Sequence, residues 1–188
     1  MATFAFGQLG LKAGANISNI STDEDNIENL KSKIGFQGGL MYRIKLLNIL
    51  AIQPEVLYTR KGADYEILGA EVEANMDYLD IPLLLILQFD SGLQFHGGLQ
   101  ASYLLQSSVK YANVSFMVEN EFEADREDFE DFDYGLVAGI GYLFKNVSID
   151  LRYTRGLKDF EKDTSIGDLE ITPSSKHFGL QASLGIFF

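Results

Sequence analysis

The chain has 188 residues, of which 46% are hydrophobic and 22% are charged, with no Cys and no Trp. This length fits one domain, and the lack of cysteine excludes disulfides, thiolate metal sites and a Cys nucleophile. The formal net charge of −12 disfavours a phosphate backbone as partner, so we expect no nucleic-acid binding. No apolar run reaches the ~18 residues of a membrane-spanning helix, whereas strands of ~9–11 residues can also cross a membrane.

Eight segments alternate apolar and polar residues with period two, which is typical of β-strands that have two different faces. In chain order, we expect strands at residues 9–17, 34–44, 50–61, 78–89, 93–105, 134–144, 147–154 and 178–188. Short connections at 46–49, 90–92 and 145–146 alternate with long ones at 18–33, 62–77, 106–132 and 158–173. This order predicts one domain over residues 1–188, an all-β, eight-stranded antiparallel up-and-down transmembrane β-barrel.

The composition of the two strand faces indicates which one points outward. One face is rich in Gly and polar residues, and it suits the narrow interior of an eight-stranded barrel. The other face carries Leu, Ile, Phe and Tyr, and it suits lipid. Aromatic residues near the strand ends are expected to form girdles at the two membrane interfaces; these are Tyr42, Tyr58, Phe89, Tyr103, Tyr142, Phe144, Tyr153 and Phe188. A soluble lipocalin-like ligand-binding barrel, with its apolar face inside, is the alternative.

Charged residues are distributed unevenly between the strands and their connections. Of 27 acidic residues, 22 lie in the four long connections. Because a buried charge needs a partner, we expect the few charges on the polar strand face to form a network that plugs the interior. This predicted network consists of Lys12, Arg43, Glu55, Asp80, Asp150 and Arg152. A narrow polar conduit for ions or small solutes is the alternative.

The third long connection is the most acidic part of the chain. Its carboxylates are hard oxygen ligands that suit Ca²⁺ or Mg²⁺, although their spacing is not that of an EF-hand loop. The weak metal candidates are Glu119, Glu121, Glu123, Asp125 and Asp128. A solvated acidic face is the simpler interpretation, and divalent bridging to lipopolysaccharide phosphates is the sharper one.

Two further features of the strands lead to expectations. Pro54 and Pro82 each remove a donor from the strand ladder, so we expect a bulge or local irregularity at each. His96 is expected near the inner end of the barrel and His177 near the outer end, too far apart to ligate one metal or share a catalytic centre. A hydrolase site that combines His177 with Ser174 or Ser175 is disfavoured, so we expect neither an enzyme nor a cofactor.

Several segments resemble the PorT-like outer-membrane β-barrel family of Bacteroidota. The segments Gln53-Pro54-Glu55 and Tyr78-Leu79-Asp80-Ile81-Pro82 are fairly specific in combination, and the likeness extends over essentially the whole chain. The resemblance implies an eight-stranded membrane barrel, and the namesake group is associated with protein secretion across the outer membrane. Phe188 looks like the terminal aromatic signal that outer-membrane assembly machinery reads.

These observations together lead to a functional expectation. Residues 1–6 lack the charged start and long apolar core of a signal peptide, so we expect a mature sequence preceded by an added Met. We expect a monomer in the cell outer membrane with a structural, adhesion or interaction role. The expected partners are membrane lipid, lipopolysaccharide, the barrel-assembly machinery and proteins at the extracellular loops. A secretion-associated barrel that acts with partner proteins is the alternative role.

Overall fold

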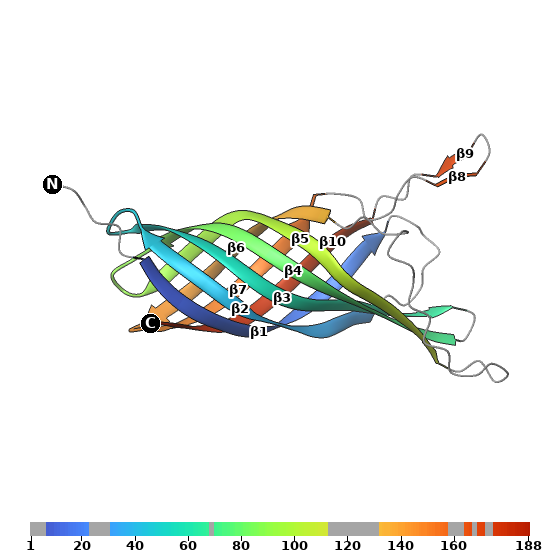
Figure 1. Ribbon diagram of the computed structural model, residues 1–188, viewed down its shortest axis with the longest axis horizontal. Coiled ribbons are helices and arrows are strands. Elements are labelled where there is room, and N and C mark those ends of the chain that lie inside the picture. Colours follow the sequence, from blue (N-terminus) through green and yellow to red (C-terminus); the bar gives the residue numbers. More distant parts are fainter. Residues whose placement is uncertain are drawn as a thin grey trace.

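A closed antiparallel barrel makes up most of the computed structural model, which describes residues 7–22, 31–67, 70–112, 132–157, 164–166, 169–171 and 175–188. Its strands are β1 (Gly7–Thr22), β2 (Lys31–Lys45), β3 (Leu50–Ile67), β4 (Ala70–Gln88), β5 (Leu93–Ala112), β6 (Phe132–Phe144), β7 (Val147–Gly156) and β10 (Ser175–Phe187). They follow the order β1-β10-β7-β6-β5-β4-β3-β2 around the barrel (Figure 1). The predicted eight-stranded up-and-down barrel is therefore confirmed. No helix long and apolar enough to cross a membrane occurs in this described part of the chain.

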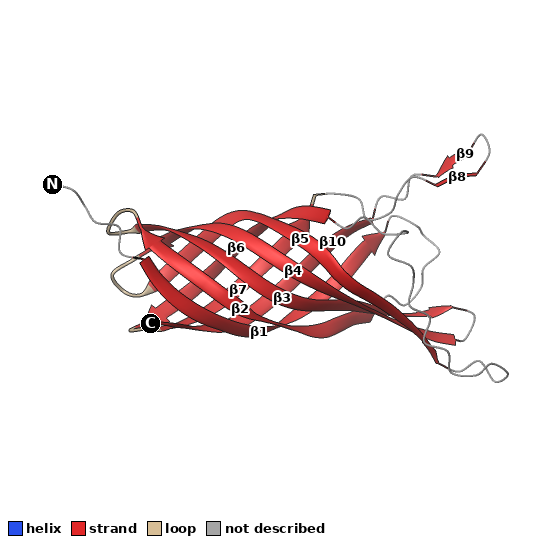
Figure 2. Cartoon of the chain, in the orientation of Figure 1, coloured by secondary structure: helices blue, strands red, loops and turns tan. Residues whose placement is uncertain are grey.

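The first and last barrel strands close the sheet. β1 pairs with β10 from Gly10 opposite Phe187 to Thr22 opposite Ser175, and the Phe188 backbone N–H donates to the Leu9 carbonyl at 2.8 Å. Short turns join β2 to β3, β4 to β5 and β6 to β7 at one end of the barrel (Figure 2). We call this end, where the C-terminus also lies, the inner end, and the opposite end the outer end.

The expected long connection at 62–77 is wrong. β3 continues to Ile67 and β4 begins at Ala70, with these two residues paired at the tip of a hairpin. β5 also runs on to Ala112, opposite Glu71 of β4. Residues 63–67 and 70–77 still alternate apolar with polar residues, so the strand pattern continues through both extensions and the sequence carries a signal for them. The short sheet of β8 (Thr164–Ile166) and β9 (Leu169–Ile171) was likewise not predicted.

The two strand prolines interrupt the ladder without shifting it. Pairing of β2 with β3 stops at Glu55 and resumes at Ile52 in the same register, so that Pro54 is skipped. Pairing of β3 with β4 likewise skips Pro82 and keeps its register. The missing proline N–H accounts for each interruption. The expected irregularity is therefore present at both prolines, as interrupted pairing and not as a bulge. The register shifts lie elsewhere, between Ser32 and Gln37 and at Asp77.

The apolar strand face points outward and the polar face points inward. On β7, Leu151 is 51% exposed while its neighbour Arg152 is 1% exposed. The same contrast holds on β4 between the exposed Leu83 and the buried Asp80. An exposed belt of large apolar side chains suits a lipid environment. It does not fit the lipocalin-like alternative, which needs this face inside the barrel.

Glycines on the inner face allow the barrel wall to pack closely. A Cβ added at Gly39 would overlap the carbonyl oxygen of Val56, and one added at Gly98 would overlap that of Leu83. These are contacts with backbone atoms of neighbouring strands, which cannot rotate away as a side chain can. The glycine-rich face is thus required by the geometry of the wall itself.

We predict that a charge in the apolar belt destabilises the barrel. Leu151→Lys should lower the free energy of unfolding in lipid vesicles by roughly 2–4 kcal/mol, because the ammonium group would face hydrocarbon near the middle of the strand. Leu151→Met, which keeps the volume and adds no charge, is the control. Urea titration followed by gel mobility measures both variants. Equal stability of the two would mean that this face does not contact lipid.

Candidate functional site in the barrel lumen

The structure buries all six charged residues for which a lumenal network was expected. Each side chain points into the barrel, and none of the residues is more than 3% exposed. These residues are Lys12 of β1, Arg43 of β2, Glu55 of β3, Asp80 of β4, and Asp150 and Arg152 of β7. Five of them connect through direct contacts or one glutamine, whereas Asp80 belongs to a second group nearer the outer end.

Glu55 and Arg152 form the central contact of the lumen. The Arg152 guanidinium donates to Glu55 through two nitrogens, Nη1 to Oε2 at 2.7 Å and Nη2 to Oε1 at 2.8 Å. Such a bidentate pair fixes both the distance and the orientation of the two groups. Three strands separate β3 from β7 in either direction around the barrel, so this pair spans the lumen from one wall to the opposite wall.

Lys12 and Asp150 complete the charge balance around this pair. Lys12 Nζ lies 3.2 Å from Glu55 Oε1 and 3.5 Å from Asp150 Oδ2. Asp150 also accepts a hydrogen bond from the Ser148 hydroxyl at 3.3 Å. Two cations and two carboxylates are therefore held in contact away from solvent, the arrangement that buried charges require. We call Lys12, Glu55, Asp150, Arg152 and the adjoining His96 the ion cluster.

His96 belongs to the ion cluster, and this role was not foreseen. Its Nε2 accepts a hydrogen bond from Arg152 Nε at 3.2 Å, so the neutral ring carries its proton on Nδ1. Nδ1 lies 3.9 Å from Asp150 Oδ1. The sequence does contain a signal for this placement. His96 follows Gln94 by two residues on β5, and residues two apart on a strand share a face, which here points inward. The side chains of Lys12, Glu55, His96 and Arg152 come from the alternate strands β1, β3, β5 and β7, and they meet at one level of the barrel.

Arg43 fills the inner end of the lumen without contacting a carboxylate in the described part of the chain. It donates to Gln53 at 2.6 Å, Gln88 at 3.3 Å and Gln94 at 3.2 Å. Its guanidinium also lies 4.4 Å from the centroid of the Phe187 ring, a cation–π distance. Gln53 donates in turn to Glu55 at 2.6 Å, which links Arg43 to the ion cluster.

Asp80 forms a separate polar group above the ion cluster. Its Oδ1 accepts from the Ser102 hydroxyl at 2.6 Å and lies 3.3 Å from Lys61 Nζ. Lys61 also stands over the Tyr78 ring, 4.5 Å from its centroid. Sequence reasoning missed Lys61 as a partner, although its two-residue spacing from Thr59 on β3 places it on the inward face.

The remaining predicted site residues fall at the edge of the described structure or beyond it. Phe188, the proposed assembly signal, is 74% exposed beside the start of β1. The weak metal candidates Glu119, Glu121, Glu123, Asp125 and Asp128 lie outside the described residues, as does Ser174. The side chains of Ser175 and His177 are not described either. Within the described part of the chain, no group of three or more His, Cys, Asp or Glu residues could hold a metal ion.

Comparison with known proteins places this barrel in a family. The model of the outer membrane protein beta-barrel domain family matches residues 6–161. Neisserial surface protein A is 15% identical, with a TM-score of 0.57 over 96% of this chain and 97% of that one. Ail, the attachment invasion locus protein of Yersinia pestis, is 15% identical, with a TM-score of 0.55 over 97% of this chain and 99% of that one.

A third structure is similar over its full length. OprG from Pseudomonas aeruginosa is 15% identical, with a TM-score of 0.50 over 98% of this chain and 97% of that one. No curated protein matches the chain. At such low identity, the solved structures support the fold and not a shared activity. The chain belongs to the outer membrane protein beta-barrel domain family and is a small barrel of the outer membrane.

Proposed function

We propose that this protein is a closed, non-enzymatic barrel that acts through its outer surface, as an adhesion or interaction protein, and that its lumen does not conduct solutes. The observation that carries the proposal is the Glu55–Arg152 pair, which joins opposite walls of the barrel through two hydrogen bonds of 2.7 and 2.8 Å. A solute that crosses the lumen would have to break this pair and leave two buried charges without partners.

Packing at the inner end supports the same proposal. Ala51 and Ile86, which belong to a buried apolar cluster, lie opposite each other there, and Arg43 is held by three glutamines and a phenyl ring. An eight-stranded barrel has an interior only just wide enough for its own side chains. The lumen below the ion cluster is therefore filled by its own side chains, and the outer segments are left as the functional surface.

The charge of the chain favours a cationic or neutral partner at that surface. The acid-rich outer connections would repel a polyanion at long range. Ail, a protein of similar fold, has been crystallised in complex with the heparin analogue sucrose octasulfate. A net charge of −12 is the opposite of what such a ligand needs, so we propose that any adhesion here depends on positively charged groups of the partner.

Membership of the PorT-like group and the identity of the assembly partners are also proposals. Gln53-Pro54-Glu55 and the segment from Tyr78 to Pro82 support membership of the PorT-like group. The exposed Phe188 at the closing seam supports reading by the barrel-assembly machinery, and acidic outer segments are compatible with divalent bridging to lipopolysaccharide.

We predict that the wild-type barrel shows no sustained conductance in a planar lipid bilayer. The double variant Glu55→Ala with Arg152→Ala should show discrete openings, because it removes the contact that joins the two walls. Arg60→Ala with Asp77→Ala, which removes an outward-facing pair, should stay silent. Stable openings of the wild-type protein at modest voltage would overturn the closed-lumen proposal.

We also predict that burial decides the strength of two ion pairs that have similar geometry. Arg60 and Asp77 form a bidentate pair at 2.7 and 2.8 Å, but the Arg60 side chain is 45% exposed beyond Tyr58, the last aromatic residue on the outward face of β3. Glu55→Gln should destabilise the barrel by about 3–5 kcal/mol, because Arg152 and Lys12 lose their shared counter-charge. Asp77→Asn should lower stability by no more than about 1 kcal/mol.

Urea unfolding in lipid vesicles measures both variants of these pairs. The double variant Glu55→Gln with Arg152→Gln should be less destabilised than the sum of its single variants, since it leaves no unpaired buried charge. Simple additivity, or equal effects at the two pairs, would contradict the central role of the ion cluster.

A further prediction concerns the outer surface. Cells that display the protein should adhere to amine-coated surfaces more than to sulfate-coated ones, because opposite charges attract. Changing Glu119, Glu121, Glu123, Asp125 and Asp128 to their amides should weaken this preference without loss of the folded, heat-modifiable gel band. Adhesion that is unaffected by salt and by these changes would exclude an electrostatic partner.

A further inference from the structure

Buried polar atoms without hydrogen-bond partners gather in the outer half of the lumen. Among the described residues, no partner is present for Asn16 Oδ1, both amide atoms of Gln37, Thr59 Oγ1 or Asp80 Oδ2. None of these four residues is more than 3% exposed. Buried polar groups in native proteins are almost always paired with protein or with ordered water, so this group needs an explanation.

The four residues are neighbours on one side of the barrel wall. Gln37 of β2 lies directly opposite Thr59 of β3, and Thr59 lies opposite Tyr78, two residues from Asp80 on β4. Asn16 of β1 lies opposite Gly35, two residues from Gln37. Since side chains two residues apart share a face, the unpartnered atoms line one inward-facing patch across β1 to β4.

The inner half of the lumen differs sharply from this patch. Gln53, Gln94 and Ser148, all fully buried there, make hydrogen bonds to other side chains. At the level of the ion cluster, His96 Nδ1 and Ser183 Oγ are without partners among the described residues. Hydrogen bonding among lumenal side chains is thus satisfied at the inner end and incomplete from the ion cluster outward.

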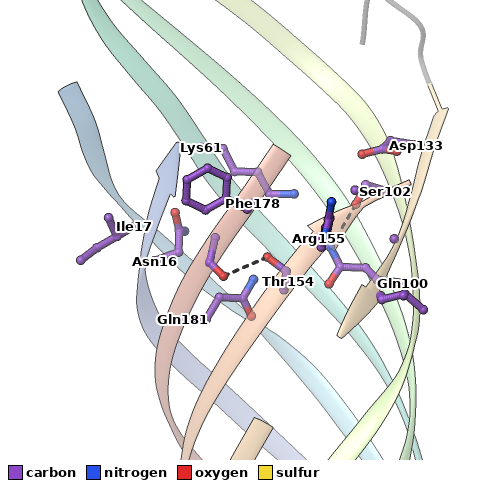
Figure 3. Close-up of a pocket in the computed structure, with 14 residues that line it drawn as sticks. Asn16, Ile17, Lys61, Gln100, Ser102, Asp133, Thr154, Arg155, Phe178 and Gln181 are labelled. Atoms are coloured by element: carbon purple, nitrogen blue, oxygen red, sulfur yellow. Dashed lines mark hydrogen bonds between the residues drawn. The ribbon is translucent and has the colours of Figure 1, made fainter. Parts of the chain in front are cut away.

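A cavity adjoins the patch at Asn16, and Figure 3 shows side chains that line it. Its volume is about 30 Å³, and its polar lining includes Asn16, Gln100, Ser102, Thr154 and Gln181. Gly135, Gly156 and Gly179 also line it, so three inward positions contribute no side chain. One water molecule needs about 10–15 Å³ of such space and two to four polar partners, and the cavity meets both requirements.

The chemistry of the unpartnered atoms indicates which ligand would bind there. All but one of these unpartnered atoms are oxygen atoms, so the ligand must mainly donate hydrogen bonds. Asp80 is already in contact with Lys61 at 3.3 Å, which balances its charge and disfavours a divalent cation beside it. A neutral donor of atomic size, namely water, fits these acceptors, and Asn16, which lines the cavity, connects them to that space.

We propose that the outer half of the lumen is a hydrated vestibule, in which ordered water bound by Asn16, Gln37, Thr59 and Asp80 extends to the ion cluster, while the inner half stays dry. The vestibule would admit water-sized ions as far as the Glu55–Arg152 pair. Only its inner boundary rests on the proposed closed lumen; the hydrated site itself does not.

Silver ions, which are of water-like size and bind thiolates, test this proposal directly. Because the chain has no Cys, a single substitution introduces a single thiol. Thr59→Cys and Gln53→Cys place that thiol on the same inward face of β3, at the patch and below the ion cluster. The folded variants in detergent are treated with Ag⁺ and then unfolded, and the thiols left free are labelled with a maleimide. Far-UV CD and the unboiled gel confirm that each variant is folded.

We expect Ag⁺ to block Cys at position 59 at least about tenfold faster than Cys at position 53, since thiol reactivity follows access. If neither thiol is blocked, or if position 53 reacts first, the vestibule is overturned. If both are blocked equally fast, the vestibule stands and the closed lumen of the proposed function fails. Ser102→Cys at the cavity and Ser148→Cys at the inner end form a second, nearly isosteric pair should either β3 variant not fold.

Discussion

Space inside an eight-stranded barrel is the constraint on which the rest of this structure depends. The lumen has room for side chains and little more, so every inward residue must pack or form hydrogen bonds with its opposite neighbours. Glycines such as Gly39 and Gly98 let the wall approach closely. The remaining inward positions must then satisfy one another across the barrel. The direct contact of Glu55 with Arg152 across the full lumen is a consequence of that narrowness.

Charge balance explains why the ion cluster takes the form it does. Lys12, Glu55, His96 and Arg152 come from alternate strands, whose inward residues converge at one level. Two cations facing two carboxylates avoid the large penalty for an isolated buried charge. Arg43 achieves the same end with neutral amide oxygens and the Phe187 ring. The lumen is thereby filled by polar side chains that hold one another in place, and this filling leaves the outer surface as the candidate for interaction with partners.

The two ends of the barrel differ because different constraints act on them. At the inner end, tight turns join the strands, and Arg43 with its three glutamines and the Phe187 ring fills the lumen. Toward the outer end, β3, β4 and β5 continue past the region where the belt faces lipid, and inward polar atoms no longer all find partners. The distribution of charge along the chain also differs between the two ends, since most acidic residues lie in the connections between strands at the outer end. A barrel whose inner end is filled by its own side chains is suited to presenting its outer end to partners.

The alternation of residues determined much of this protein without a structure. Eight strands, their short turns, the lipid-facing side and six of the inward charges follow from period-two patterns, because a strand with two environments must alternate. The expected connection at 62–77 was nevertheless wrong, because the alternation continues through residues 63–67 of β3 and 70–77 of β4. Tertiary structure alone decided which inward charges meet. Contact of Glu55 with Arg152, or of His96 with Arg152, depends on the strand order and stagger around the closed barrel, which residue patterns along single strands do not encode.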